Sequence, residues 1–268
     1  MHPRVSLHQV AFMDESTAVF LDFCRQAGFQ NAVLAVPKID ADGLEDARQA
    51  VRVGGLHIAA LNQLFAVHPD LEADAGEAVA GLTEAVAMAE TLGARSIYLL
   101  TGGRGSLSWE GAAARFAELV APCTAAARTK GIEILIENAP ALYADIHIAH
   151  TLADTLRLAE AAEIGVCVEL FACWAEADLE HLFRRAMPRC GLVQVSDYVL
   201  GDRALPARAV PGDGCIPLER LLGQVLEAGY TGLFDIELIG PRIAAEGPEA
   251  AARRAGERVS EMLMRLGA

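Results

Sequence analysis

The chain has 268 residues, a formal net charge of −14 and a hydrophobic fraction of 53%. The negative charge disfavours nucleic-acid phosphates, and no apolar run approaches the roughly 20 residues that a membrane span requires. A cytoplasmic location is expected, because the opening MHPRVSLHQVAF has no apolar segment followed by a small-residue cleavage site.

Eight short apolar runs alternate with eight helical patterns along the whole chain. The runs cover residues 5–10, 32–36, 56–61, 95–101, 133–137, 164–170, 192–197 and 233–238. The helical patterns cover about 17–28, 44–53, 75–92, 110–130, 151–162, 178–186, 218–228 and 248–266. A glycine stands just before most runs, as a helix C-cap or a tight turn requires.

This alternation predicts an α/β protein with one parallel sheet covered by helices. Eight strand–helix units are the number that closes a (β/α)₈ TIM barrel. An open doubly wound sheet would need a glycine-rich turn after its first strand, and SLHQVAFMDES contains no glycine. No linker or low-complexity run divides the sequence, so residues 1–268 are predicted to form a single domain. The six scattered cysteines form no CxxC pair, which disfavours a disulfide scaffold or a zinc ribbon.

In such a barrel the chemistry lies at the carboxyl ends of the strands, where polar residues end the runs. These residues are His8, Asn62, Gln63, Thr101, Glu137, Asn138, Glu169, Gln194, Asp197 and Glu237. Strands five to eight are neighbours, so Glu137, Glu169, Gln194 and Glu237 should converge on one side of the mouth.

Three carboxylates that lie this close cannot all stay ionised without a counter-charge. A divalent cation is the simplest counter-charge, and an oxygen-only ligand set favours Mg²⁺ or Mn²⁺ over Zn²⁺. The alternative is that each carboxylate is solvated or paired with an arginine.

Five segments carry a resemblance that covers nearly the whole chain: ILIEN (134–138), GVCVEL (165–170), VQVSD (193–197), PGDG (211–214) and GYTGLFDIEL (229–238). They resemble the xylose isomerase-like TIM barrels, which include sugar isomerases and epimerases, inosose and dehydroshikimate dehydratases and a type of repair nuclease. The resemblance implies that Glu137, Glu169, Gln194 and Glu237 hold the metal. Two of these depart from the family, which has Asp where this chain has Glu169 and His where it has Gln194. A further family His falls on Ala172.

The resemblance implies a metal-dependent isomerase or epimerase of a keto-sugar, polyol or related hydroxy-carbonyl compound. The proton next to the carbonyl is removed to give an enediolate, with Glu137 and Glu237 in the proton-transfer roles. A dehydratase acting on an inosose or a dehydroshikimate type of substrate is the runner-up, because the same enolate can expel a hydroxyl group. The third hypothesis is a non-catalytic polyol-binding barrel that has lost its metal. The nuclease branch fits poorly, since its metal-binding histidines are missing here.

Further residues are predicted to bind the small polyhydroxy substrate. They are His8, Arg208, Asp197, His147, Trp109 and Asn138. Arg208 lies in the loop LPARAVPGDG, where it would bind a substrate oxygen or else pair with Asp202 or Asp213 at the surface. Asp197 would orient Gln194 or pair with Arg208. No nucleic-acid or membrane partner is expected, and the resemblance allows a homodimer, because related barrels commonly pair.

Overall fold

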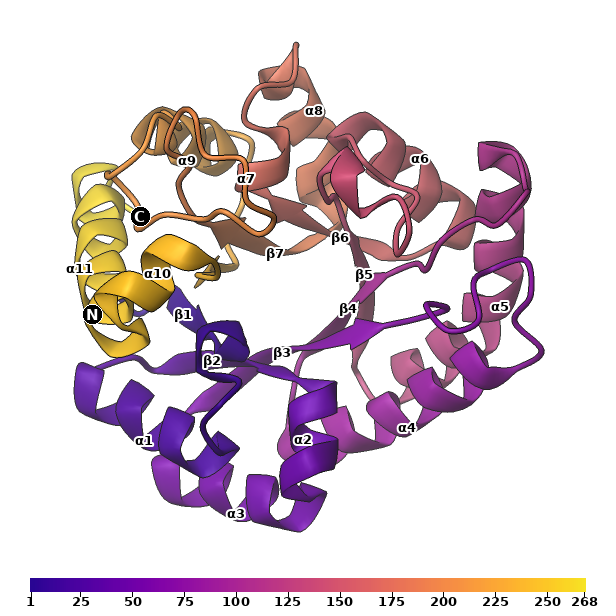
Figure 1. Ribbon diagram of the computed structural model, residues 1–268, viewed down its shortest axis with the longest axis horizontal. Coiled ribbons are helices and arrows are strands. Elements are labelled where there is room, and N and C mark those ends of the chain that lie inside the picture. Colours follow the sequence, from indigo (N-terminus) through magenta and orange to yellow (C-terminus); the bar gives the residue numbers. More distant parts are fainter.

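The computed structural model describes residues 1–268 and contains one closed barrel of parallel strands in chain order (Figure 1). The strands are β1 (Val5–His8), β2 (Asn31–Ala35), β3 (His57–Leu64), β4 (Ser96–Leu100), β5 (Glu133–Glu137), β6 (Gly165–Glu169), β7 (Cys190–Val195) and β8 (Leu233–Ile236). β8 pairs with β1, so that Leu7 lies opposite Ile236 and the sheet has no free edge. The predicted (β/α)₈ barrel is confirmed.

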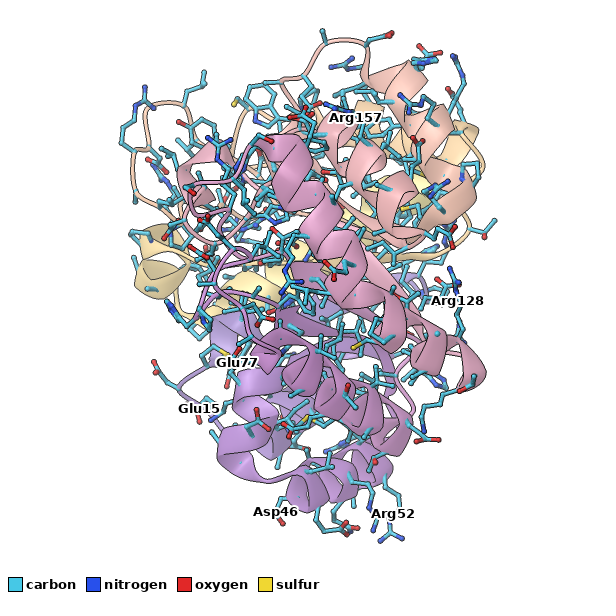
Figure 2. The ribbon with its side chains drawn as sticks, turned by 90° about the vertical axis from the view of Figure 1, so that its right-hand side faces the viewer. Glu15, Asp46, Arg52, Glu77, Arg128 and Arg157 are labelled. Carbon is cyan, nitrogen blue, oxygen red and sulfur yellow. The ribbon has the colours of Figure 1, made fainter.

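Helices form a ring around the strands, and their charged side chains, such as Asp46, Arg52 and Arg128, face solvent (Figures 1 and 2). The α-helices are α1 (Thr17–Ala27), α2 (Val36–Asp42), α3 (Leu44–Gly54), α4 (Glu77–Leu92), α5 (Trp109–Thr129), α6 (Leu152–Ala162), α7 (Leu170–Cys173), α8 (Leu179–Ala186), α9 (Leu218–Glu227), α10 (Pro241–Glu246) and α11 (Pro248–Arg265). Three 3₁₀ turns are η1 (Gln9–Phe12), η2 (Ala141–Tyr143) and η3 (Met187–Arg189). No helix is both long and apolar enough to cross a membrane.

Some element boundaries differ from the prediction for local reasons. β1 ends at His8 rather than at residue 10, because η1 follows at once and the His8 side chain accepts a hydrogen bond from the N–H of Val10. β3 runs on through Asn62 and Gln63 to Leu64, since both residues stay paired with β4. Short α2, α7 and α10 were not predicted. In α2, Pro37 begins a helix instead of only ending a strand, as proline does in a first turn.

The apolar residues form two cores on either side of the sheet. The larger core lies between strands and helices and contains 73 buried residues. A small core fills the barrel interior, where alternate strand residues point inward. Its members are Val33, Ala59, Ala60, Tyr98, Leu135, Cys167 and Leu192. The interior above this layer is polar, and it contains Glu137, Glu169, Gln194 and Glu237.

Candidate active site

The four residues predicted to form the site lie together at the carboxyl ends of β5 to β8. Glu137 ends β5, Glu169 ends β6, Gln194 lies near the end of β7 and Glu237 directly follows β8. The strand register places Glu169 opposite Gln194, and Gln194 opposite Asp235. Glu237 follows Asp235 by two residues and therefore lies on the same inward face. The barrel therefore directs three carboxyl groups and one amide into its mouth.

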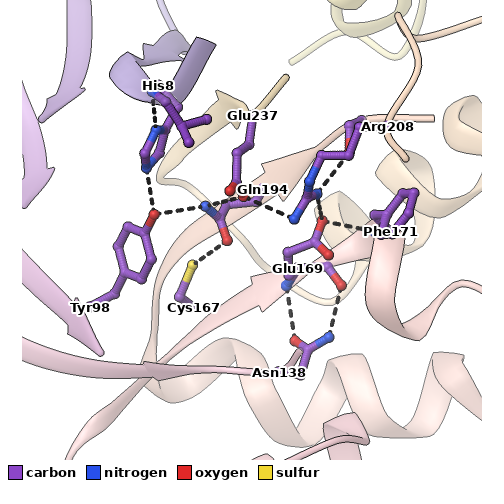
Figure 3. Close-up of polar contacts among 11 residues, drawn as sticks. His8, Tyr98, Asn138, Cys167, Glu169, Phe171, Gln194, Arg208 and Glu237 are labelled. Carbon is purple, nitrogen blue, oxygen red and sulfur yellow. Dashed lines mark hydrogen bonds and ion pairs between the residues drawn. The ribbon is translucent and has the colours of Figure 1, made fainter. Parts of the chain in front are cut away.

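Arg208 lies between two of these carboxylates (Figure 3). Its Nη1 donates to Glu169 Oε1 at 2.8 Å and to Ser196 Oγ at 2.9 Å, and its Nη2 lies 3.2 Å from Glu237 Oε2. The guanidinium carbon lies 4.7 Å from the centre of the Phe171 ring. Only 8% of the residue is exposed, so this is a buried cation paired with one buried and one partly buried carboxyl group.

The surface alternative for Arg208 is wrong. Asp202 pairs instead with Arg242, and Asp213 pairs with Arg254 and Arg258 on α11. The sequence also allowed the strand-end carboxylates to pair with an arginine. Glu169 and Glu237 do so in the structure, both with Arg208.

A chain of hydrogen bonds continues from Glu237 across the mouth (Figure 3). Gln194 Nε2 donates to Glu237 Oε2 at 2.9 Å and to the Tyr98 hydroxyl at 3.2 Å, while Gln194 Oε1 accepts from the Cys167 thiol at 3.4 Å. The Tyr98 hydroxyl lies 2.6 Å from His8 Nε2. Because His8 Nδ1 accepts the backbone N–H of Val10, the proton of the neutral ring is on Nε2 and is donated to Tyr98.

Burial raises the pKa values of two of the three carboxyl groups, and the single cation among them offsets this only in part. Burial, followed by the charges of Glu237 and Glu169, raises the pKa of Glu137 well above its usual range. Burial raises the pKa of Glu169 to about 7, although Arg208 acts in the opposite direction. Glu137 has no cationic hydrogen-bond partner, so nothing in direct contact offsets the effect of burial, which favours its protonated form.

Asn138 and His147 hold strand ends in place. Asn138 donates to the carbonyl of Glu169 at 2.8 Å and accepts the Glu169 N–H at 2.9 Å, which ties the end of β5 to that of β6. His147 Nδ1 lies 3.1 Å from the N–H of Thr101, and its Nε2 lies 2.9 Å from the carbonyl of Glu137. Both side chains are buried and make hydrogen bonds to backbone groups, so they hold the strand ends that carry the site residues.

Asp197 holds the β7–α9 loop and contacts neither the Gln194 nor the Arg208 side chain. Its carboxylate accepts four backbone N–H groups, and these come from Tyr198, Gly212, Gly214 and Ile216. Gly214 must be glycine, because a Cβ there would lie 2.3 Å from Asp197 Oδ1. The Asp197 backbone also pairs with Ala209, which sets the neighbouring Arg208 over the mouth.

Trp109, the predicted apolar wall, lies away from the carboxylates. Its indole N–H donates to the carbonyl of Ile148 at 2.9 Å, and the Arg157 guanidinium lies 4.2 Å from its ring centre. Another aromatic residue, Phe171, does lie against Arg208, and it also lines a groove of 270 Å³ that neither Arg208 nor the strand-end carboxyl groups line. Trp174, Tyr198 and the exposed Leu142 and Leu205 also line this groove.

Tyr98, Ser196 and Asp235 belong to the polar interior but were not predicted as site residues. Asp235 is fully buried, accepts a hydrogen bond of 2.7 Å from Ser6 and leaves its Oδ2 without a partner. Spacing was the available signal, because Asp235 precedes Glu237 by two residues and Ser196 follows Gln194 by two. Tyr98 gave no such signal, since an aromatic residue in mid-strand also suits an apolar core.

Two of the three carboxyl groups predicted to bind the metal accept hydrogen bonds, Glu169 from Arg208 and Glu237 from Gln194, while the buried Glu169 Oε2 has no partner. A guanidinium lies between Glu169 and Glu237, and Gln194 turns its amide nitrogen, which has no lone pair for a metal, toward Glu237. No group of three His, Cys, Asp or Glu side chains is placed to hold a metal ion. As arranged, this set does not fit a metal ion, and the predicted Mn²⁺ or Mg²⁺ site stays a prediction.

The two buried histidines make stability depend on pH. Burial lowers the pKa of His8 to about 4 and that of His147 to about 3, against about 6.5 in an unfolded chain. Below pH 6.5 these two side chains therefore bind more protons in the unfolded state, and their contribution lowers stability as the pH falls toward the folded pKa. The raised pKa values of Glu137, Glu169 and Asp235 act in the opposite direction. At pH 5 each histidine should cost about 2 kcal/mol of the free energy of unfolding.

We expect His147→Gln to remove this residue's contribution, so that between pH 7.5 and pH 5 the variant loses less stability, or gains more, than the wild type in urea unfolding. His181, which is exposed on α8, supplies the matched control, and His181→Gln should leave the dependence as it is in the wild type. An equal loss of stability between the two pH values in wild type and His147→Gln would contradict the assignment.

Solved structures with the same fold include proteins of several activities. A protein of Sinorhizobium meliloti 1021 is 24% identical over 98% of both chains, with a TM-score of 0.85. The IolI protein, described with a binding zinc atom, is 16% identical over 98% of this chain and 99% of its own, with a TM-score of 0.83. An L-ribulose 3-epimerase is 17% identical over 99% of this chain and 96% of its own, with a TM-score of 0.79. At such identities the likeness shows the fold alone.

The sequence itself is the stronger link to a family. No curated protein sequence matches the chain at a significant level. A family model described as xylose isomerase-like TIM barrel matches residues 21–261, which is nearly the whole barrel from α1 to α11. The chain therefore belongs to the xylose isomerase-like TIM barrel family.

Proposed function

We propose that the protein is an isomerase or epimerase of a small polyhydroxy carbonyl compound and moves a proton at the carbon next to the carbonyl. The observation that carries this proposal is the pair Glu137 and Glu237 at one barrel mouth. Burial raises the pKa of Glu137 and favours its protonated form, whereas Glu237 pairs with Arg208 and accepts from Gln194 as a carboxylate does. A protonated and an ionised carboxyl group in one site are the components of acid–base catalysis.

In this mechanism Glu237 removes the proton and Glu137 supplies one. Negative charge then develops on the substrate oxygen, and the Arg208 guanidinium stabilises it inside a mouth that excludes most water. Return of a proton to the opposite face of the same carbon gives the epimer, while protonation of the neighbouring carbon gives the isomer. Tyr98 keeps its phenolic proton, because burial and the charges of Glu237 and Glu137 raise its pKa.

The surroundings favour a neutral, partly apolar substrate. The net charge of −14 repels anions at long range, and Phe171, which lies against Arg208, also lines a groove together with Trp174 and Tyr198. Aromatic rings pack against the C–H faces of sugars and cyclic polyols, while their hydroxyl groups turn toward polar side chains. The epimerase among the structures of the same fold is in keeping with this class of substrate.

A dehydratase is the second candidate, and the protonated Glu137 favours it. A carboxylic acid in that position can protonate a β-hydroxyl group as it leaves, so that the enolate collapses to an unsaturated carbonyl compound. The two reactions share proton abstraction by Glu237 and differ in the product.

Deuterium exchange tests the proposal. The protein is incubated in D₂O with a panel of keto-sugars and inososes, and NMR follows deuterium at the carbon next to each carbonyl. Incorporation with a change of stereochemistry or carbonyl position is the expected result, and a vinylic product would identify the dehydratase. Ligands that raise the melting temperature while no compound exchanges its proton would instead support a binding protein and contradict catalysis.

A further inference from the structure

We propose that the Arg208 guanidinium takes the place of a divalent metal ion in this barrel, so that the protein works without one. The inference rests on the proposed function in one respect, because it names Arg208 as the electrophile of that reaction. Its structural part is that Arg208 occupies the cation site between Glu169 and Glu237. This part is testable without a substrate.

The first support is that the cation position is filled by the chain. Arg208 contacts Glu169 at 2.8 Å and Glu237 at 3.2 Å, and all three side chains are largely or fully buried. A divalent ion bridging the same carboxylates would lie within a few ångströms of the guanidinium. Repulsion between like charges is strong at that distance in a buried mouth, so the two cations exclude each other.

The second support is the direction of Gln194. Its amide nitrogen faces Glu237 and Tyr98, and its oxygen accepts from Cys167. A carboxylate only accepts hydrogen bonds, so the contact with Glu237 fixes which end of the amide points there. The amide thus supplies another donor to Glu237 and no oxygen to an ion at the Glu169–Glu237 pair.

The third support is that Arg208 is anchored, which sets it apart from a mobile side chain that swings aside. Ser196 accepts from its Nη1, Phe171 stacks on the guanidinium, and the Arg208 N–H donates to the carbonyl of Ile239 at 3.1 Å. Behind it, the loop packs so closely that a Cβ at Gly240 would lie 2.8 Å from the carbonyl oxygen of Pro206.

The remaining donors of Arg208 indicate how it would meet a substrate. A guanidinium has five N–H groups. Nη1 uses both of its hydrogens on Glu169 and Ser196, and Nη2 directs one at Glu237. The Nε–H and the second Nη2–H remain, and they lie side by side on one edge of the planar guanidinium. Two such parallel donors can bind two neighbouring oxygen atoms at the same time. We therefore expect a substrate with two adjacent oxygens, such as an α-hydroxy ketone and its enediolate.

Metal uptake tests the inference on the intact protein. The purified chain is treated with EDTA, incubated separately with Mn²⁺, Mg²⁺ and Zn²⁺, and passed through a desalting column before its metal content and melting temperature are measured. We expect far less than one equivalent of each metal and an unchanged melting temperature. Close to one equivalent of any of them in the wild type, lost in Glu169→Gln, would overturn the inference.

Arg208→Met supplies the complementary arm, because it removes the charge and keeps an apolar side chain against Phe171. Titration calorimetry with Mn²⁺ should show tighter binding to this variant than to the wild type, and Arg208→Lys, which keeps the charge, should behave as the wild type. Arg208→Met that folds, as judged by circular dichroism, yet binds no more Mn²⁺ would overturn the claim that the guanidinium excludes metal. If this variant does not fold, the wild-type uptake decides.

The two proposals fail separately. Deuterium exchange that appears only after a metal is added would overturn the role of Arg208 and leave the isomerase proposal standing. Absence of both exchange and metal uptake would contradict the isomerase and leave the cation assignment intact.

Discussion

Replacing Glu137 by glutamine should slow deuterium exchange into the substrate by about 10²- to 10⁴-fold, the usual contribution of one acid–base group. Glutamine has nearly the shape of a glutamic acid but cannot give up a proton. Because burial raises the pKa of Glu137 and favours the neutral acid, the neutral amide is a close substitute for it, and the free energy of unfolding should change little. The rate is measured by NMR in D₂O and the stability by urea unfolding of the same preparations.

Glu133→Gln is the matched control for this experiment. Glu133 lies on the same strand at its opposite, amino-terminal end and is exposed, so this change should leave exchange intact. Exchange that survives in Glu137→Gln at the wild-type rate would remove Glu137 from the mechanism. A loss of exchange in both variants would point to a general effect on β5 and would equally count against the assigned role.

Replacing Asp197 by asparagine should lower the free energy of unfolding by about 3 kcal/mol or more, since hydrogen bonds to a charged acceptor contribute about 1.5–3 kcal/mol each. The carboxylate accepts from Tyr198 and Ile216 at Oδ1 and from Gly212 and Gly214 at Oδ2. An asparagine keeps one accepting oxygen, and its NH₂ group then faces two backbone donors. The loop should loosen, and exchange should fall with it because Arg208 loses its position.

Asp202→Asn provides the comparison within the same loop. Asp202 pairs with Arg242 near the surface, and such pairs contribute about 1 kcal/mol or less. Urea unfolding of both variants at pH 7.5 separates the two cases. Equal and small losses of stability would show that the four hydrogen bonds of Asp197 do not hold the loop.

The fold could be predicted because its signals are local and repeated. Each apolar run is short, is bounded by glycine or polar residues and is followed by a helical pattern, so that the number of units follows from the sequence. β3 was predicted too short, since Asn62 and Gln63 were interpreted as a strand end although pairing with β4 continues through them. Tertiary pairing overrides residue preference at such positions.

The site was predictable only as far as strand ends determine it. Glu137, Glu169, Gln194 and Glu237 come together because parallel strands place their carboxyl ends at one face. The place of Arg208 depends on the path of a long loop, and that path is set by the backbone contacts of Asp197. Sequence spacing contains no information on such a path, so Arg208 could be assigned only to the loop.

The polar chain across the mouth has a consequence for folding. It begins at His8 on β1, passes through Tyr98 and Gln194, and reaches Glu237 after β8, so it joins residues from both ends of the sequence. Contacts of such long range form late, after the loop-closure entropy has been overcome. Until β8 docks, Arg208 has Glu169 as its only carboxylate partner, and the ring of strands is open. Arg208 meets its second carboxylate, Glu237, only when β8 lies in place in the barrel. A chain in which the barrel has not closed therefore has no assembled site.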